Sequence, residues 1–116
     1  MADPTGDGAV ALLTLIEDRP APDVLVLHVS GELDLATAPR LQAAVAAATG
    51  HLVVDLTSVT FLGSHGLRVL LDCTERTTTV LVGVEHPAVA RPLRLTGLDF
   101  VFQVHPSVSA ALAARG

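Results

Sequence analysis

Residues 55–71 of the chain read DLTSVTFLGSHGLRVLL. The apolar run just before this stretch predicts a strand buried on both faces over residues 51–56. A loop is expected over residues 57–63, and a helix that Ser64 caps and that extends to about residue 76. The side chains that this helix turns toward the core are expected to be Leu67, Leu70, Leu71 and Thr74.

The region before this stretch is predicted to form an antiparallel hairpin. Residues 10–16 are apolar and indicate a first strand, and residues 24–29 are rich in Val and Leu and indicate a second. Residues 17–23 lie between them and include Pro20 and Pro22, which favour a turn. A short connection between two apolar runs is typical of a hairpin.

A first helix is predicted between the second strand and residues 51–56. Residues 31–34, GELD, end the second strand, and Thr37 is the expected N-cap of the helix. Gly50 is placed to end the helix. Its apolar stripe is formed by Leu41, Ala44, Val45 and Ala48.

The C-terminal part continues the alternation of strands and helices. Residues 79–84 indicate a strand, and Pro87 and Gly97 mark the two ends of a further helix. Residues 101–104 indicate a short strand, followed by a terminal helix that Pro106 opens. The inward side chains of that terminal helix are Val108, Ala111 and Leu112.

The predicted order of elements is therefore β-β-α-β-α-β-α-β-α. Strands separated by helices imply parallel neighbours joined by right-handed crossovers, so we expect an α/β fold. The predicted architecture is a mixed sheet of four to five strands with helices packed against it. The chain has 116 residues, which is enough for one domain. Residues 1–9 are expected to be a lead-in and residues 10–116 the folded domain.

Composition argues against several classes of partner. The net charge is −5, which does not favour binding to nucleic acid or to an anionic membrane surface. The N-terminus has no basic segment typical of a signal peptide, and no apolar run approaches the roughly 18 residues that span a bilayer. The single cysteine, Cys73, forms no internal disulfide, which is consistent with a reducing cytoplasm.

The sequence also lacks the patterns of common catalytic and cofactor sites. No glycine-rich nucleotide fingerprint is present, and the five histidines have no metal-ligand spacing, so we expect no cofactor and no metal. Ser64, His65 and Asp34 are not expected to form a catalytic triad, because Ser64 and His65 are neighbours that do not face each other on a helix. No catalytic residue is therefore assigned, and the protein is not expected to be an enzyme.

Four further side chains have expected positions or roles. His28 lies within a predicted strand and is expected to be a structural histidine with a hydrogen-bond partner. Cys73 falls off the predicted apolar stripe of its helix, so we expect partial exposure. Arg68 and Arg76 lie on the same helix and are candidates for one partner-binding face.

The start of the predicted second helix suits a phosphate switch. Free backbone N–H groups and the helix dipole favour negative charge at this end. Phosphorylation of a hydroxyl there adds about 1.5 to 2 negative charges and changes a docking surface. The structural alternative is that Ser64 only caps the helix and Gly66 only permits close packing.

The stretch resembles the signature of the bacterial anti-sigma factor antagonists, the STAS family, roughly DLSxVxF[ILM]DS[ST]GL. Residues 31–34, GELD, are similar to a second motif of that family. Residues 87–89, PAV, and 95–98, LTGL, are similar to a third. The three motifs occur in the family's order, and the resemblance extends from about residue 10 to the C-terminus.

The resemblance implies the STAS fold and a role in partner switching, without catalysis. Family members bind an anti-sigma factor, commonly a kinase of the histidine-kinase-like ATPase fold, and thereby free a sigma factor for transcription. The kinase phosphorylates a Ser or Thr at the start of the second helix and breaks the complex. The oligomeric state is left open between a monomer and a weak dimer.

The chain departs from the family pattern at the phospho-acceptor. His65 occupies the usual acceptor position, and Gly63 replaces the preceding Asp. The favoured hypothesis is that the ordinary Ser/Thr switch is lost. Other hypotheses are that Ser64 has become the acceptor, that His65 makes docking pH-sensitive, or that His65 is merely tolerated on an exposed loop.

The resemblance also implies a set of partner-binding positions. Asp34 matches the Asp of the GELD motif, which lies near the phosphorylation loop in the family, although it also suits a turn before a helix. The expected partner-binding residues are Asp34, Gly63, Ser64, His65, Gly66 and Arg68. The alternative function is a STAS scaffold or sensor-complex subunit that binds a different signalling protein.

Overall fold

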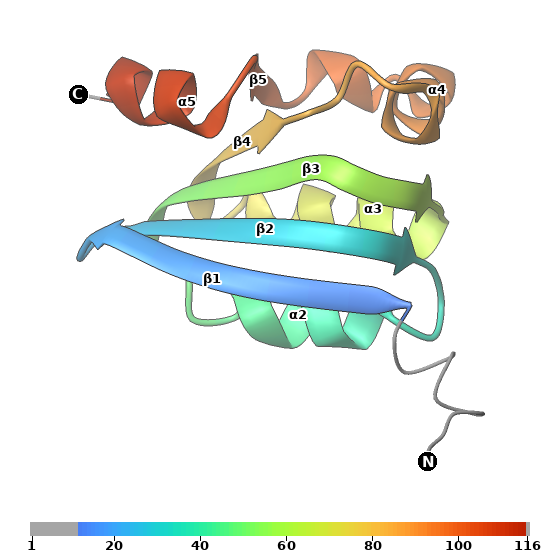
Figure 1. Cartoon of the computed structure of the whole chain (residues 1–116), viewed down its shortest axis with the longest axis horizontal. Helices are drawn as coiled ribbons and strands as arrows, with labels where there is room; N and C mark the ends of the chain where they lie inside the picture. Colours follow the sequence, from blue (N-terminus) through green and yellow to red (C-terminus); the bar gives the residue numbers. More distant parts are fainter. Residues whose placement is uncertain (1–11, 116) are drawn as a thin grey trace.

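A computed structural model of the chain describes residues 12–115 (Figure 1). Five strands form one sheet in the order β1-β2-β3-β4-β5, in which β1 and β2 are antiparallel and all other neighbours are parallel. The strands are β1 (Leu13–Ala21), β2 (Val24–Leu33), β3 (Gly50–Leu62), β4 (Thr77–Val82) and β5 (Gln103–His105). The helices are α2 (Ala38–Val45), α3 (Ser64–Cys73), α4 (Pro87–Thr96), the short 3-10 helix η1 (Leu98–Phe100) and α5 (Val108–Arg115). This arrangement confirms the predicted α/β fold, its mixed sheet and the order of its main elements.

The first hairpin is confirmed, but its predicted boundaries are wrong. Strand β1 extends to Ala21, so that most of the expected turn over residues 17–23 belongs to the strand. Proline is tolerated because β1 is an edge strand, and the pairing register with β2 shifts between Asp18 and Ala21, around Pro20. Residues 1–11 lie outside the described residues, and so does the predicted start of this strand at residue 10.

The loop predicted over residues 57–63 is also wrong. Strand β3 continues to Leu62 and pairs along the second half of β2, with two register shifts in that pairing. Val59 and Leu62 are buried although polar or exposed residues separate them. The irregular pairing breaks the simple alternation of apolar and polar side chains, which is why the sequence pattern indicated a loop.

Gly50 does not end the first helix. Helix α2 ends at Val45, and Gly50 begins β3 with a φ of +73°. A Cβ atom at this position would lie 2.6 Å from the backbone oxygen of Asp23. The glycine therefore permits a close approach to the β1–β2 turn, and the predicted helix stop is wrong.

The C-terminal strands are shifted from their predicted positions. Strand β4 begins at Thr77 and ends at Val82, because residues 77–79 pair with the start of β3. Strand β5 begins at Gln103, two residues later than expected, because η1 forms immediately after α4. Gly97 ends α4 in a left-handed conformation, as predicted.

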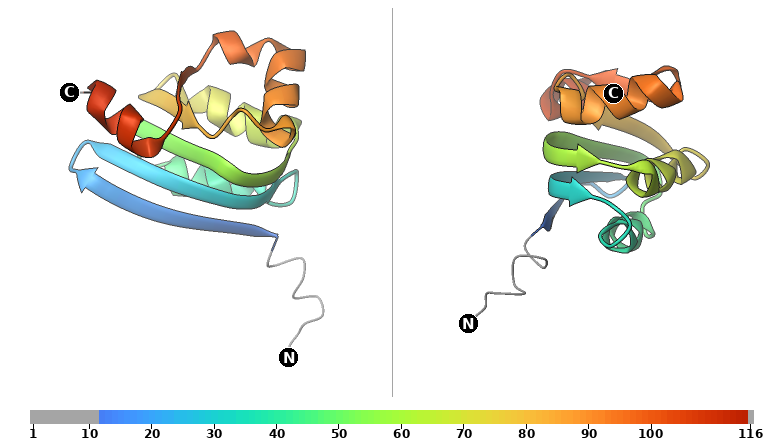
Figure 2. Two further views of the ribbon diagram at one scale, coloured as in Figure 1. Left: turned by 45° about the horizontal axis from the view of Figure 1, so that its top comes forward. Right: turned by 90° about the vertical axis from the view of Figure 1, so that its right-hand side faces the viewer.

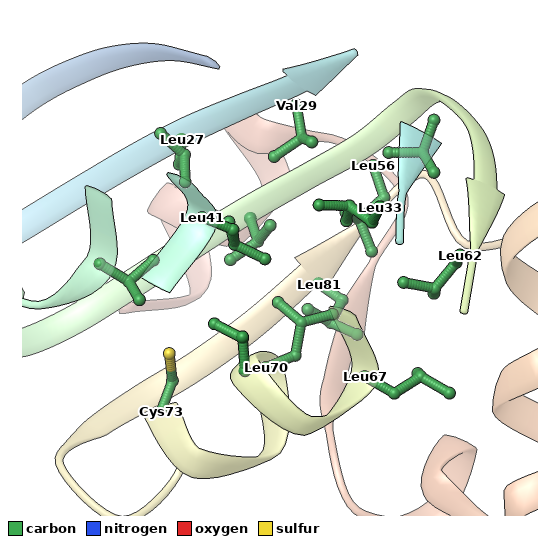
Figure 3. Close-up of a cluster of buried hydrophobic side chains, with 14 of the residues drawn as sticks. Leu27, Val29, Leu33, Leu41, Leu56, Leu62, Leu67, Leu70, Cys73 and Leu81 are labelled. Atoms are coloured by element: carbon green, nitrogen blue, oxygen red, sulfur yellow. The ribbon is translucent and has the colours of Figure 1, made fainter. Parts of the chain in front are cut away.

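Buried side chains form two separate clusters on the two faces of the sheet. Helices α2 and α3 lie on one side of the sheet (Figure 2), and α4 contributes to the same cluster. The helical-face core contains most of the buried leucines of the chain (Figure 3). Helix α5 lies against the opposite face, beside the first half of β3 (Figure 2, left). The opposite-face core consists of Val24, Val26, Val53, Val80, Val82 and Ala111.

Cys73 belongs to the helical-face core, so the predicted partial exposure is wrong. Its side chain is completely buried (Figure 3), and burial raises the pKa of the thiol. The core-facing side of α3 includes Cys73 and excludes Thr74, which is exposed. Leu67 and Leu70 are buried as predicted, and Leu71 packs at the margin. A buried thiol of raised pKa has little thiolate character, which favours a packing role.

Candidate functional site

The candidate site lies where two neighbouring parallel strands end. Strands β2 and β3 both finish at the right-hand end of the sheet in Figure 1, so the segments that follow them meet there. Gly63 donates its backbone N–H to the carbonyl oxygen of Leu33 at 2.9 Å. This hydrogen bond ties the start of α3 to the end of β2, beside Asp34.

Helix α3 begins at Ser64, but the residue does not cap it. Gly63 is the N-cap, and no side chain provides a capping hydrogen bond, so the prediction that Ser64 caps α3 is wrong. The first helical hydrogen bond is donated by the N–H of Leu67 to the carbonyl of Gly63 at 3.1 Å. The first turn carries no acidic residue, so its free N–H groups form a positively polarised surface.

Gly66 sets the distance between α3 and the end of β2. A Cβ atom at Gly66 would lie 2.8 Å from Cβ of Leu33 and 3.0 Å from a methyl carbon of Leu62. Gly66 is buried, whereas Ser64 and His65 are exposed. Gly66 therefore permits close packing beneath the exposed turn, as the structural alternative for this residue predicts.

Asp34 organises the turn that leads into α2. Its Oδ1 accepts a hydrogen bond from the N–H of Thr37 at 3.0 Å, and its own N–H donates to Oγ1 of Thr37 at 2.9 Å. The hydrogen bond from the Thr37 backbone holds the pKa of the Asp34 carboxyl below its ordinary value. Thr37 is the N-cap of α2, as predicted, although its hydroxyl donates to the carbonyl of Glu32. Asp34 makes no hydrogen bond to α3 within residues 12–115.

Ser64 and His65 line different grooves on the two sides of α3. His65 lies in the α2–α3 groove, which is lined by Leu35, Ala38, Pro39, Gln42, His65, Arg68, Val69 and Asp72. Ser64 lies in the α3–α4 groove, which is lined by Ser64, Leu67, Arg68, Leu71, Thr96 and Leu98. Successive helical residues point about 100° apart, which separates the two side chains. This separation agrees with the prediction that they form no nucleophile–base pair.

The two arginines of the second helix have different positions. Arg68 is exposed between the two grooves and forms an ion pair with Asp72 at 3.3 Å. Arg76 lies beyond the opposite end of α3, where its guanidinium donates to the carbonyls of Val45 and Ala48, both at 3.4 Å. The prediction that both border one partner face is therefore wrong for Arg76, which joins α2 to α3.

Exposed apolar side chains surround the start of α3, and sequence patterns did not predict them. Leu35 is 68% exposed and lines the groove of His65. Phe61 is 51% exposed, and its ring would lie 3.0 Å from a Cβ at Gly63. Leu95 of α4 is 81% exposed and lines the same hollow as Phe61. The only feature of the sequence that could have indicated this apolar surface is an apolar residue beside a turn motif, as at Leu35.

The α3 docking surface comprises these apolar side chains and the polar ones between them: Leu35, Phe61, Ser64, His65, Arg68 and Leu95. Apolar groups gathered beside polar and charged ones are typical of surfaces that bind other proteins. Asp34 and Gly63 border this surface, and Gly66 supports it from below. The structure thus brings five of the six predicted partner-binding residues to one exposed end of the molecule.

Histidine and acidic side chains elsewhere in the described residues have mainly structural contacts. No group of three or more His, Cys, Asp or Glu within residues 12–115 is arranged to hold a metal ion. His28 Nδ1 lies 2.9 Å from Oδ2 of Asp55, which confirms a partnered structural histidine. In the described part of the chain, no helix is both long and apolar enough to cross a lipid bilayer.

Comparisons with known proteins agree with this geometry. The family model of the STAS domain matches residues 16–111. The anti-sigma-F factor antagonist RsfB of Mycobacterium tuberculosis is 38% identical over 96 residues, which cover 77% of this chain and 79% of RsfB. RsfA, an anti-sigma-F factor antagonist of the same species, is 32% identical over 100 residues and 78% of each chain.

A solved structure extends the similarity to three dimensions. The crystal structure of an anti-sigma factor antagonist from Mycobacterium paratuberculosis has 40% sequence identity and a TM-score of 0.75, covering 88% of this chain and 92% of that one. Fold, motif order and sequence identity over most of the chain therefore agree. This chain belongs to the STAS-domain family of anti-sigma factor antagonists, which are non-enzymatic regulators that act by partner switching.

Proposed function

We propose that this chain binds an anti-sigma factor of the histidine-kinase-like ATPase type through the α3 docking surface, and that it lacks the usual Ser/Thr phosphorylation switch. Binding would free a sigma factor for transcription, and the expected place of action is the cytoplasm. The relatives RsfB and RsfA are anti-sigma-F factor antagonists. The exposed apolar side chains around α3 support a protein as the partner.

The proposal that the switch is lost rests on the position of His65. It occupies the family's acceptor position, is exposed, and lines the groove that also contains Leu35 and Arg68. An imidazole is not a substrate for phosphorylation at a Ser or Thr hydroxyl. The adjacent hydroxyl of Ser64 lies in the other groove, beside Leu67 and Thr96. A kinase that docks its active site over the His65 groove would therefore not find a hydroxyl at the expected place.

The surroundings of α3 also explain how a phosphate would act at this position. The free N–H groups of the first turn stabilise negative charge, and Arg68 lies in the same groove, so a phosphate would change the charge of the docking surface. Without an acceptor, the surface keeps its unmodified form. The protein is then constantly competent to bind, and its activity is set by its amount or by the state of its partner.

Affinity capture with the tagged full chain, followed by binding assays with the purified partner, tests the proposal. We expect the chain to capture an anti-sigma factor with a kinase-type ATPase domain. Adding ATP should not release wild-type protein, whereas the His65→Ser variant should be phosphorylated at the substituted position and released.

A second pair of variants tests the interface. Leu35→Ala should weaken binding of the anti-sigma factor more than about fivefold, while Ile16→Ala, at an exposed apolar side chain of β1, should leave the affinity unchanged.

Each outcome separates the two parts of the proposal. Release of wild-type protein by ATP, absent in Ser64→Ala, would mean that Ser64 has become the acceptor and that the switch is retained. Binding that is insensitive to Leu35→Ala would place the interface elsewhere. Capture of a different signalling complex, without an anti-sigma factor, would favour the scaffold function.

A further inference from the structure

A second hollow lies on the opposite face of the sheet, far along β3 from the α3 docking surface. Residues of β3, β4, β5 and α5 line it, near the ends at which β3 and β4 begin. Its cavity volume is about 150 Å³. That is room for a small molecule or for several waters, since one water needs roughly 10–15 Å³ by this kind of measure. We name it the α5 pocket.

Strand pairing brings polar side chains together in this pocket. His51 of β3 pairs with Thr78 of β4, and Gln103 of β5 pairs with Val80, two residues further along β4. Alternate residues of a strand point to the same face, so Thr78 and Val80 share a side of the sheet. His105 lies two residues after Gln103 and also lines the pocket. Four polar side chains from three strands therefore line one pocket beside α5, where Thr78 and Gln103 are exposed and His51 and His105 are half-buried.

These four side chains have no partners within the described part of the chain. No side-chain hydrogen bond joins His51, Thr78, Gln103 or His105 to another of residues 12–115. The Nδ1 atom of His51 is buried and has no hydrogen-bond partner there. Most buried polar atoms in proteins are paired, and an unpaired one costs about 1–3 kcal/mol. A polar ligand that turns the imidazole ring toward it would remove this cost.

The charges around the pocket select the kind of ligand. Among residues 12–115, Arg115 of α5 is the only Arg or Lys that lines the pocket, and no Asp or Glu of this part of the chain lines it. One guanidinium nitrogen is 2.8 Å from Oδ1 of Asp23, which lies outside the lining. A guanidinium has five N–H donors, so this ion pair leaves others for a ligand. The hydroxyl of Thr78 and the amide of Gln103 provide further donors.

We propose that the α5 pocket binds a small oxyanion, a carboxylate or a phosphate, between Arg115 and the polar side chains of β3, β4 and β5. Val53 and Val80 form the buried apolar part of the lining, and the polar side chains around them provide the donors for the oxygen atoms. The ligand would join α5 to three strands. The proposal is independent of the function assigned to the α3 docking surface.

The proposal is tested by nuclear magnetic resonance titration of the full chain, at constant ionic strength, with sodium phosphate, sodium acetate and sodium chloride. We expect saturable shifts of backbone amides in residues 51–53, 78–80, 103–105 and 111–115 with at least one of the two oxyanions, and none with chloride. Saturation by phosphate alone or by acetate alone identifies which source of the oxyanion the pocket accepts.

Two variants and a matched control keep the test specific. Thr78→Val and Gln103→Ala should each weaken binding by about three- to tenfold, the value of one hydrogen bond. Gln42→Ala changes an exposed glutamine of α2 outside the pocket and should leave the affinity unchanged. Shifts that never saturate, that chloride reproduces, or that center on residues 63–66 would overturn the proposal, as would equal affinity in Gln103→Ala.

Discussion

The two faces of the sheet are built differently. The helical-face core is large, rich in leucine and covered by α2, α3 and α4 (Figure 3), whereas the opposite-face core has five valines and one alanine under α5 alone. The α3 docking surface sits at the margin of the larger core, and the α5 pocket sits beside the smaller one. We infer that the end that carries the proposed docking surface is held rigidly, while the attachment of α5 is weaker and has room for a ligand.

The largest expected effect follows from a cavity in the helical-face core. Leu70 of α3 is completely buried, so Leu70→Ala should lower the free energy of unfolding by about 2–5 kcal/mol. Urea unfolding measures the change. As a control, Leu95→Ala removes an exposed leucine of α4 and should change stability by no more than about 0.5 kcal/mol. A loss below about 1 kcal/mol for Leu70→Ala would contradict the rigid attachment of α3.

A matched pair of valines compares the two faces directly. Val54 in the helical-face core and Val26 in the opposite-face core are both fully buried in central strands. Replacing Val by Ala removes two carbon atoms, worth about 1.6 kcal/mol by transfer alone. We expect Val54→Ala to cost more than Val26→Ala, because denser surroundings lose more contacts around a cavity. Equal or reversed losses in urea unfolding would mean that α5 covers its face as effectively as three helices do.

A smaller effect is expected at the end of α5. Arg115→Ala removes the ion pair with Asp23 and should cost about 0.2–1 kcal/mol, since both groups are partly exposed. Hydrogen exchange should become faster in α5 and stay unchanged in α3. Asp23→Asn provides the second variant of a double-mutant cycle. Faster exchange throughout the protein would show that α5 is required for the whole fold.

The smallest effect on the free energy of unfolding is expected at acid pH. It concerns Asp55 of β3, on the part of the opposite face that α5 leaves open. Burial raises the pKa of Asp55, but hydrogen bonds from Thr57 and His28 outweigh it and leave the pKa below its ordinary value. A lowered pKa stabilises the folded state above the unfolded pKa of about 3.9, and this stabilisation is lost as the pH falls further. Asp55→Asn should therefore weaken the dependence of stability on pH below about pH 4.

The control for this prediction is a carboxylate without such partners. Asp18 is exposed on β1 and makes no side-chain hydrogen bond within residues 12–115. Asp18→Asn should leave the slope of unfolding free energy against pH as it is in the wild type. The slope of unfolding free energy against pH should be measured from roughly pH 2.5 to 7, which covers the titration range of carboxyl groups. Identical slopes for Asp55→Asn and Asp18→Asn would contradict the role assigned to the hydrogen bonds of Asp55.

Sequence patterns predicted the fold wherever local physics decides the structure. Runs of Val and Leu predicted the central parts of β2 and β3, and the glycine at residue 97 predicted the end of α4. Motif order predicted the family, and with it the location of the site at the start of α3. Each of these features depends on side chains within a few residues of one another, or on their order along the chain.

Features that depend on contacts between distant segments needed the structure. Strand β3 extends through the predicted loop because β2 pairs with it despite two register shifts. Cys73 is buried because the side of α3 that carries it packs against α2 and the sheet. The separation of Ser64 and His65 into two grooves, and the gathering of Leu35, Phe61 and Leu95 around them, also required the packed helices. The sequence by itself thus determined the order of elements and the family, because these are properties of local pattern and of motif order along the chain. Only the tertiary structure decided which side chains share a surface, because that depends on how helices and strands pack.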